Sequence, residues 1–220
     1  MAGTGTRPRT PEVIVIGVTG GVGTGKSTVA RLFGGLGAEV FDADRVVHRL
    51  MEPGKPVWKK IRAKFGPGIL QPDGRIDRKR LGQTVFRSPV RLKALNRIVH
   101  PEVRRSILRD LRRLEARRPR GVAVLDIPLL IESGRAYPTD AVVVVTAPRQ
   151  AAARRLKARS GWSPAEMKRR SGFQMPLREK VKHADFVVRN GGSLEDTRRQ
   201  VIHVWKKITG EGVHGRRKDG

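Results

Sequence analysis

Short apolar runs recur along the chain, with amphipathic segments between them. The β-branched runs predict five strands: Val13–Val18, Glu39–Asp42, Val122–Asp126, Ala141–Val145 and Asp185–Val188. Most of these runs are almost continuously apolar, which is typical of strands buried on both faces of a parallel sheet.

Helical periodicity fills the intervals between these runs. After Lys26 the apolar residues recur at i, i+3, i+4 and i+7, which predicts an amphipathic helix: Val29, Leu32, Phe33 and Leu36. The last helix repeats the pattern behind a capping pair formed by Ser193 and Asp196. Strands that alternate with helices predict an α/β fold, in which right-handed crossovers join a parallel five-stranded sheet flanked by helices.

Two stretches interrupt the alternation. Residues 51–118 hold amphipathic helices without a convincing strand, and we expect helices to begin at Ser88-Pro89 and again at Pro101. Residues 155–182 are dense in Arg and Lys, and Ser163-Pro164 with Glu166 predicts a capping box there. A basic helical segment of this kind suits a lid that covers phosphates.

These patterns divide the chain into parts. The predicted core comprises 13–50, 119–154 and 183–209, with a helical insertion at 51–118 and a lid at 155–182. We expect a flexible N-terminal arm at 1–12 and a flexible tail at 210–220, because both are polar or Gly-rich.

Composition narrows the class of protein. The chain has no cysteine, which excludes disulfides, thiolate metal sites and a cysteine nucleophile. No run reaches the roughly 20 apolar residues that cross a bilayer, so we expect no membrane span and a cytoplasmic location. The formal charge of +27 attracts polyanions such as nucleotides, nucleic acid or acidic lipid, but solvated helix faces explain it equally well.

The strongest motif is a glycine-rich loop at the end of the first strand. Residues 20–27 match G-x-x-x-x-G-K-[ST] without a mismatch: Gly20, Gly21, Val22, Gly23, Thr24, Gly25, Lys26 and Ser27. Glycines let the backbone N–H groups turn toward phosphates, and the helix N-terminus adds favourable partial charge. Lys26 can bridge the β- and γ-phosphates, and the Ser27 hydroxyl can bind Mg²⁺. The motif predicts a site for a nucleoside triphosphate.

Acidic residues follow two of the other predicted strands. Asp42-Ala43-Asp44 ends the second strand, where ligands bind in open α/β sheets. One of these acids could accept the proton of an attacking hydroxyl or hold Mg²⁺ through water. The alternative for Asp44 is a structural role as the N-cap of the following helix. Asp126 ends the third strand, where a P-loop protein keeps its second magnesium carboxylate, so Ser27 and Asp126 are the candidate metal ligands. The absence of N-K-x-D disfavours a GTPase and leaves a small kinase.

The chain resembles the dephospho-coenzyme A kinases through an ordered set of segments between Val13 and Lys207. The opening Val18–Thr28 and the Asp42-Ala43-Asp44 triplet are followed by these pieces: Ile76-Asp77-Arg78, Val85-Phe86, Ile98-Val99-His100-Pro101, Asp126–Glu132, Arg155–Arg159, Arg170, Gln174-Met175-Pro176, Lys180, Ala184-Asp185 and Asn190-Gly191. Each piece is weak alone, but the ordered set is specific.

The resemblance implies transfer of a phosphoryl group from ATP, with Mg²⁺, to the 3′-hydroxyl of dephospho-coenzyme A. It also implies that the core, 13–50, 119–154 and 183–209, binds the nucleotide and that the helical insertion at 51–118 binds the acceptor substrate. It implies that Asp44 acts as the base and that Arg155, Arg159 and Arg170 belong to the lid and neutralise charge. The remaining residues implied to hold ATP, besides Lys26, are Thr19, residues 20–25, Ser27 and Thr28.

Other interpretations stay open at this stage. The nearest rival is another small P-loop kinase acting on a nucleoside or nucleotide. A rival of a different class is an RNA-associated ATPase, which the charge of +27 suggests but which no aromatic RNA-binding motif supports. We interpret His100 and the three tryptophans mainly as packing residues. The basic residues within 112–118 are interpreted as a solvated helix face. Gln174 and Lys180 either bind nucleotide or end helices.

Overall fold

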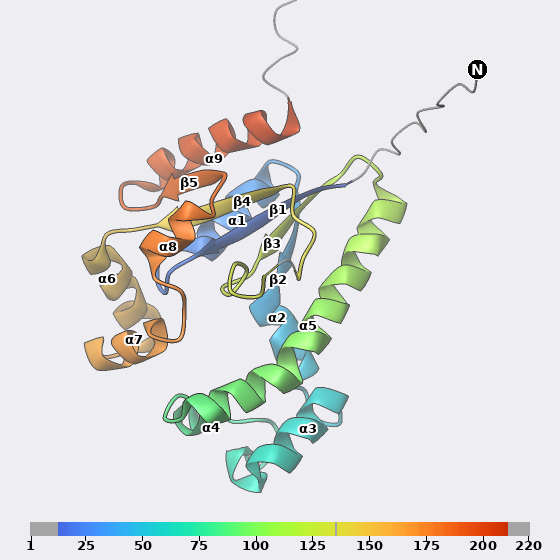
Figure 1. Cartoon of the computed structure of the whole chain (residues 1–220), viewed down its shortest axis with the longest axis vertical. Coiled ribbons are helices and arrows are strands. Elements are labelled where there is room, and N and C mark those ends of the chain that lie inside the picture. The colour runs from blue at the N-terminus through green and yellow to red at the C-terminus, as the bar shows by residue number, and fades with distance from the viewer. Residues whose placement is uncertain (1–12, 135, 211–220) are drawn as a thin grey trace, which may run out of the picture.

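The computed structural model describes residues 13–134 and 136–210 (Figure 1). The arm predicted at 1–12, and all of the predicted tail except residue 210, lie outside these residues. Within the described part, no helix combines the length and the apolar character needed to cross a bilayer.

Within these described ranges, five parallel strands form one sheet in the order β2-β3-β1-β4-β5. The strands are β1 (Ile14–Gly20), β2 (Glu39–Asp42), β3 (Val122–Asp126), β4 (Ala141–Thr146) and β5 (Phe186–Arg189). The predicted sheet is confirmed, and β1 and β3 are the most deeply buried strands because they lie at its centre. The register pairs Asp126 with both Val18 and Asp42, so the carboxyl ends of three strands meet.

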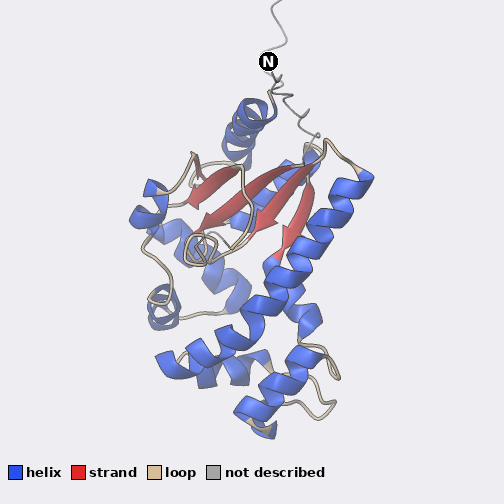
Figure 2. Cartoon of the chain, turned by 45° about the vertical axis from the view of Figure 1, so that its right-hand side comes forward, coloured by secondary structure: helices blue, strands red, loops and turns tan. Residues whose placement is uncertain are grey.

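The described helices fall into three groups along the chain, and Figure 2 shows helices on both faces of the sheet and more helices below it. Those of the core are α1 (Lys26–Gly35), α2 (Ala43–Leu50) and α9 (Leu194–Thr209), and those of the insertion are α3 (Pro56–Phe65), the 3₁₀ turn η1 (Pro67–Ile69), α4 (Arg78–Val85) and α5 (Pro89–Arg117). The basic segment forms α6 (Arg149–Ser160), α7 (Pro164–Ser171) and α8 (Leu177–Lys182). Figure 1 shows α6 and α7 on the same side of the sheet as the insertion, beyond the carboxyl ends of the strands.

Each face of the sheet is covered by its own apolar cluster. On one face α1 and α9 pack together, with the rings of Phe33 and Trp205 6.5 Å apart between centroids. On the other face Leu111 and Leu114 of α5 belong to the same cluster as Val15 and Leu125 of the sheet. The C-terminal half of α5 is therefore part of the core, while its N-terminal half contacts α3 and α4.

The helix starts were predicted well, with one exception. The Ser193 side chain and Asp196 form a complete capping box, and Ser88 caps α5 as expected. Ser163 caps α7 by accepting from the Glu166 N–H at 3.2 Å, but the Glu166 carboxylate bonds to arginines instead of closing the box.

The exception is Pro101, which does not begin a new helix. It lies inside α5, a continuous helix of 29 residues. An interior proline costs about 3 kcal/mol through its lost N–H and its clash with the preceding turn. Burial of Val99, Val103 and Ile107 on either side of it offsets that cost, and α5 changes direction part-way along its length (Figure 1).

The packing of α9 gives a stability prediction. Val204 is 4% exposed in the cluster between α9 and the sheet, far along the chain from the glycine-rich loop. We expect Val204→Ala to lower the free energy of unfolding by about 2 kcal/mol because it removes two buried methyl groups. Urea unfolding measures this loss, and enzyme turnover at 25 °C should stay at the wild-type value. A reduced turnover in the folded variant would show that α9 packing influences the site.

Candidate active site

The glycine-rich loop takes the conformation that a phosphate-binding loop needs. Gly23 and Gly25 have φ angles of 77° and 88°, a region that favours glycine, and Gly25 is the N-cap of α1. A Cβ atom on Gly25 would lie 2.1 Å from the Asn190 side-chain nitrogen. The loop is therefore packed closely against Asn190, which requires glycine for space as well as for conformation.

Buried polar groups support this loop from below. The Asn190 amide donates to the Thr24 carbonyl at 2.8 Å, and Thr197 donates to the Asn190 oxygen at 3.1 Å. Arg155 also donates to the Thr24 carbonyl, at 3.4 Å. The Thr24 hydroxyl donates to Gly21, so its side chain braces the loop from inside. Sequence reasoning included Asn190 only as a piece of the family resemblance, because a single asparagine carries no recognisable signal.

Asp42 and Asp44, at the junction of β2 and α2, have different surroundings. Asp42 caps α2 by accepting from the Arg45 N–H at 3.1 Å. Asp44 is not the cap; it lies in the first turn of α2, is exposed, and lines a cavity together with Lys26. This arrangement leaves the Asp44 carboxylate available to a ligand.

Asp126 lies under the phosphate-binding loop and is 5% exposed. Burial raises the pKa of its carboxyl group, while a hydrogen bond with Ser27 and the charge of Lys26 act in the opposite direction. The described residues contain no cluster of three or more His, Cys, Asp or Glu that would hold a metal unaided. A hydroxyl and a carboxylate nevertheless fit Mg²⁺, which binds oxygen ligands and usually keeps several waters and substrate phosphates.

A cavity of about 880 Å³ extends from the glycine-rich loop to the insertion. Its wall includes Val22, Gly23 and Lys26 of the loop, Asp44 of α2, the loop that follows β3, and basic residues of α5. It brings together residues from the core, the insertion and the predicted lid. A donor phosphate on Lys26 and an acceptor hydroxyl beside Asp44 would share this space.

The cavity also contains residues that sequence reasoning missed. Arg104 and Arg112 of α5 line it together with Tyr137, and the Arg104 side chain is fixed to the Ala136 carbonyl at 2.6 Å. We had interpreted Arg112 as part of a solvated helix face; it is exposed, but it also faces the cavity. Arginine spacing along a helix does not reveal which side faces a ligand until the helix is packed.

Two of the predicted lid arginines, Arg155 and Arg170, have described side chains, and these take different positions. Arg155 reaches the underside of the loop, and Arg170 lies between the rings of Phe86 and Trp162, at 4.3 and 4.2 Å from their centroids. Arg159 belongs to α6, but its side chain lies outside the described part of the structure. Their charge-neutralising roles stay predictions, since only Arg170 lines the cavity among the lid arginines whose side chains are described.

Two further sequence candidates also line the cavity. His100 lies on its α5 wall, and Gln174 follows the lid helix α7. The Gln174 side-chain oxygen is buried and has no hydrogen-bond partner among the described residues. A buried acceptor without a donor favours a hydrogen bond with a ligand in the cavity.

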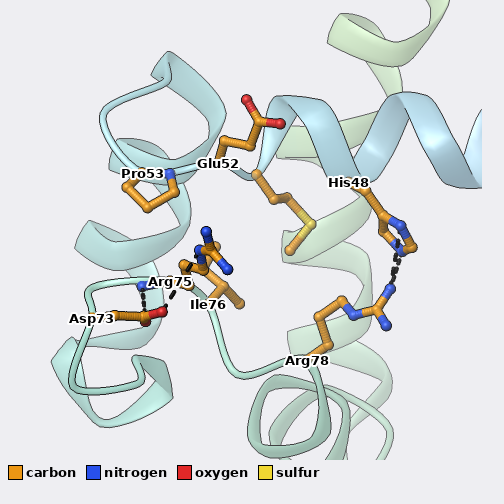
Figure 3. Close-up of a pocket in the computed structure, with 8 residues that line it drawn as sticks. His48, Glu52, Pro53, Asp73, Arg75, Ile76 and Arg78 are labelled. Atoms are coloured by element: carbon orange, nitrogen blue, oxygen red, sulfur yellow. Dashed lines mark hydrogen bonds and ion pairs between the residues drawn. The ribbon is translucent and has the colours of Figure 1, made fainter.

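A second hollow lies at the outer end of α2 (Figure 3). Its basic side chains are already engaged: Arg75 pairs with Asp73 at 3.6 Å, and Arg78 contacts the His48 ring. It lacks Asp44 and the glycine-rich loop, so it does not fit a phosphoryl-transfer site.

Comparison with known proteins identifies the family. The family model for dephospho-CoA kinase matches residues 14–196. The chain belongs to the dephospho-CoA kinase family. It is 46% identical over 196 residues to the dephospho-CoA kinase of Symbiobacterium thermophilum, covering 89% of this chain and 82% of that protein. The enzyme of Leifsonia xyli subsp. xyli is 43% identical over 196 residues, with coverage of 89% and 99%.

Solved structures agree with this membership. A protein from Thermus thermophilus superposes with a TM-score of 0.74 at 41% identity, covering 90% of this chain and 98% of its own. The dephospho-CoA kinase of Campylobacter jejuni gives a TM-score of 0.65 at 29% identity, with the same coverage. The predicted P-loop α/β fold and the family resemblance are therefore confirmed.

The support beneath the loop gives a testable prediction for this family member. Asn190→Asp keeps the oxygen that accepts from Thr197 but removes the donor to the Thr24 carbonyl. We expect ATP affinity to fall at least about tenfold, because the loop loses a buried hydrogen bond worth about 1–1.5 kcal/mol and a carboxylate oxygen faces the Thr24 carbonyl in its place. Isothermal titration with ATP measures this change.

Gln200→Ala is the matched control for this change. The Gln200 amide bonds to the Arg189 N–H and carbonyl, so it joins β5 to α9 at the residue before Asn190 but makes no bond to the Thr24 carbonyl. We expect Gln200→Ala to lower stability without weakening ATP binding. Equal ATP affinities in Asn190→Asp and the wild type would contradict the supporting role of Asn190.

Proposed function

We infer that this protein transfers the γ-phosphoryl group of ATP to the 3′-hydroxyl of dephospho-coenzyme A, giving coenzyme A and ADP, the last step of coenzyme A synthesis. The observation that carries the inference is the shared cavity, in which Lys26 of the glycine-rich loop and Asp44 line the same space. Membership of the dephospho-CoA kinase family supplies the acceptor.

The donor binds at the glycine-rich loop. The backbone N–H groups of residues 20–25 and the N-terminus of α1 face the phosphates, while Lys26 neutralises the β- and γ-phosphoryl oxygens. Ser27 and Asp126 would hold Mg²⁺, which on binding supplies charge neutralisation to the phosphates. Thr19, which was expected to hold ATP, is fully buried, and its hydroxyl donates to the Pro128 carbonyl.

The acceptor enters from the insertion side of the cavity. Dephospho-coenzyme A carries a diphosphate, and Arg104 and Arg112 give the α5 wall the positive charge that such a group requires. Asp44 orients the 3′-hydroxyl and accepts its proton as the new P–O bond forms and the bond to ADP breaks. Catalysis in this scheme comes mainly from positioning and charge neutralisation around a loose transition state.

The lid and the location of the enzyme complete the proposal. We propose that the lid, residues 155–182, closes over both substrates and excludes water, and that its arginines Arg155, Arg159 and Arg170 then neutralise charge on the phosphoryl group in transfer.

Because ATP is the donor, we propose that the enzyme works in the cytoplasm. The RNA-associated ATPase remains the alternative suggested by the charge of +27, and a nucleoside kinase is the nearest rival in chemistry.

A coupled ADP-release assay with ATP, Mg²⁺ and dephospho-coenzyme A tests the proposal, with mass spectrometry of the product. We expect a product one phosphoryl group heavier than the acceptor. Turnover of a nucleoside in its place, or ATP hydrolysis that depends on RNA and falls steeply with salt, would favour one of the alternatives.

The assigned roles predict two losses of activity. Lys26→Ala should lower kcat by about a thousandfold or more, because the phosphoryl group in transfer loses its main protein cation.

Asp44→Asn should lower kcat by about a hundredfold to ten-thousandfold while leaving ATP affinity unchanged, since only proton acceptance is removed. Asp73→Asn, at an exposed acid of the outer hollow, is the control that should retain turnover. Wild-type turnover by Asp44→Asn would refute the role of Asp44.

A further inference from the structure

A fully buried lysine lies beside the active site without lining its cavity. Lys180 of α8 is 0% exposed. Its ammonium group donates to the Pro128 carbonyl at 2.7 Å and forms an ion pair with Glu132 at 2.9 Å. Both partners belong to the loop after β3, so Lys180 binds this loop to α8.

The same two acceptors reach further segments. The Pro128 carbonyl also accepts from the Thr19 hydroxyl at the end of β1, at 3.1 Å. The Glu132 oxygen that pairs with Lys180 also accepts from the Met175 N–H at 2.9 Å. Lys180, Glu132 and Pro128 therefore form a clasp that joins the start of the phosphate-binding loop, the loop after β3 and the end of the lid.

Every segment held by this clasp continues into the cavity wall. Pro128 lines the cavity with its neighbours Ile127 and Leu129. Met175 directly follows Phe173 and Gln174, which line another part of the wall. The clasp thus fixes the distance between two parts of the acceptor cavity.

A buried ammonium group is costly unless it is paired, so its presence calls for an explanation. Burial lowers the pKa of Lys180, and the hydrogen bond and charge of Glu132 oppose that change. A methionine of similar size would fill the same space without the cost, but it could not join two acceptors on different segments. The chemistry favours a role in holding geometry over a role in packing alone.

We propose that Lys180 is a positioning residue that, through Pro128 and Glu132, sets the spacing of the acceptor cavity wall and the anchorage of the lid end. It touches no substrate and acts through the residues that it holds. The kinetic form of this proposal rests on the proposed function, since the acceptor is taken to be dephospho-coenzyme A.

Steady-state kinetics of Lys180→Met test the role. We expect KM for dephospho-coenzyme A to rise about tenfold, because the acceptor wall loosens. KM for ATP should change less than about twofold, because the Thr19–Pro128 bond and the Asn190 support of the loop both stay in place. Glu132→Ala should produce the same selective rise, and the double variant should be no worse than Lys180→Met, since the two residues act as a unit. Val204→Ala is the control for lost stability without a selective KM effect.

Amide hydrogen exchange provides a readout that is independent of the substrate. Lys180→Met should increase exchange in residues 173–175 at least about tenfold over both the wild type and Val204→Ala, because the Met175 N–H loses its fixed acceptor. If the wild type does not phosphorylate dephospho-coenzyme A, the proposed function fails, while exchange alone still decides the clasp.

Three results would overturn the clasp. The first is amide exchange in residues 173–175 that does not change in Lys180→Met. The second is a Lys180→Met enzyme whose KM for dephospho-coenzyme A does not rise. The third is an equal rise of the KM values for dephospho-coenzyme A and ATP in that variant. If Lys180→Met does not fold, the double variant Lys180→Met/Glu132→Ala is judged by the same criteria, because removing both partners leaves no unpaired charge at this buried position.

Discussion

The phosphate-binding loop can present its N–H groups to a ligand only if its carbonyl groups are bonded elsewhere, and the rest of the site depends on that constraint. The Thr24 carbonyl receives hydrogen bonds from Asn190 and Arg155, and Asn190 is itself fixed by Thr197. A loop with unbonded carbonyls under its surface would turn them outward, toward the phosphates that it should attract. The polar contacts beneath the loop are therefore as important to function as the glycines within it.

The same edge of the sheet concentrates opposite charges at short range. Asp126 lies under Ser27 and near Lys26, while Asp44 follows the neighbouring strand and faces the cavity. Burial makes the Asp126 charge costly, and the cation and hydroxyl beside it reduce that cost. Charged and polar groups that are already held in place need little rearrangement when a charged ligand binds.

The long helix α5 connects this edge to the acceptor side. Its C-terminal half is buried against the sheet, and its N-terminal half carries the insertion. Arg104 and Arg112 reach the cavity from α5, so the position of these cations is set by the packing of the core. This arrangement also explains why the helix tolerates Pro101: a break there would separate the insertion from the sheet that positions it.

The sequence by itself determined the parallel sheet, the glycine-rich loop and the family, because apolar periodicity and the G-x-x-x-x-G-K-[ST] spacing are local properties of the chain. It also predicted that Asp42, Asp44 and Asp126 lie at one edge of the sheet, since acids that follow the strands of a parallel sheet meet there, and the family resemblance singled out Asp44. Only the tertiary structure decided that Asp42 rather than Asp44 caps α2, that α5 continues through Pro101, and that Arg112 faces the cavity. The bonds from Asn190 to Thr24 and from Lys180 to Glu132 were decided there too, because they join residues distant in sequence, and no local pattern records which distant groups a buried amide or ammonium will meet.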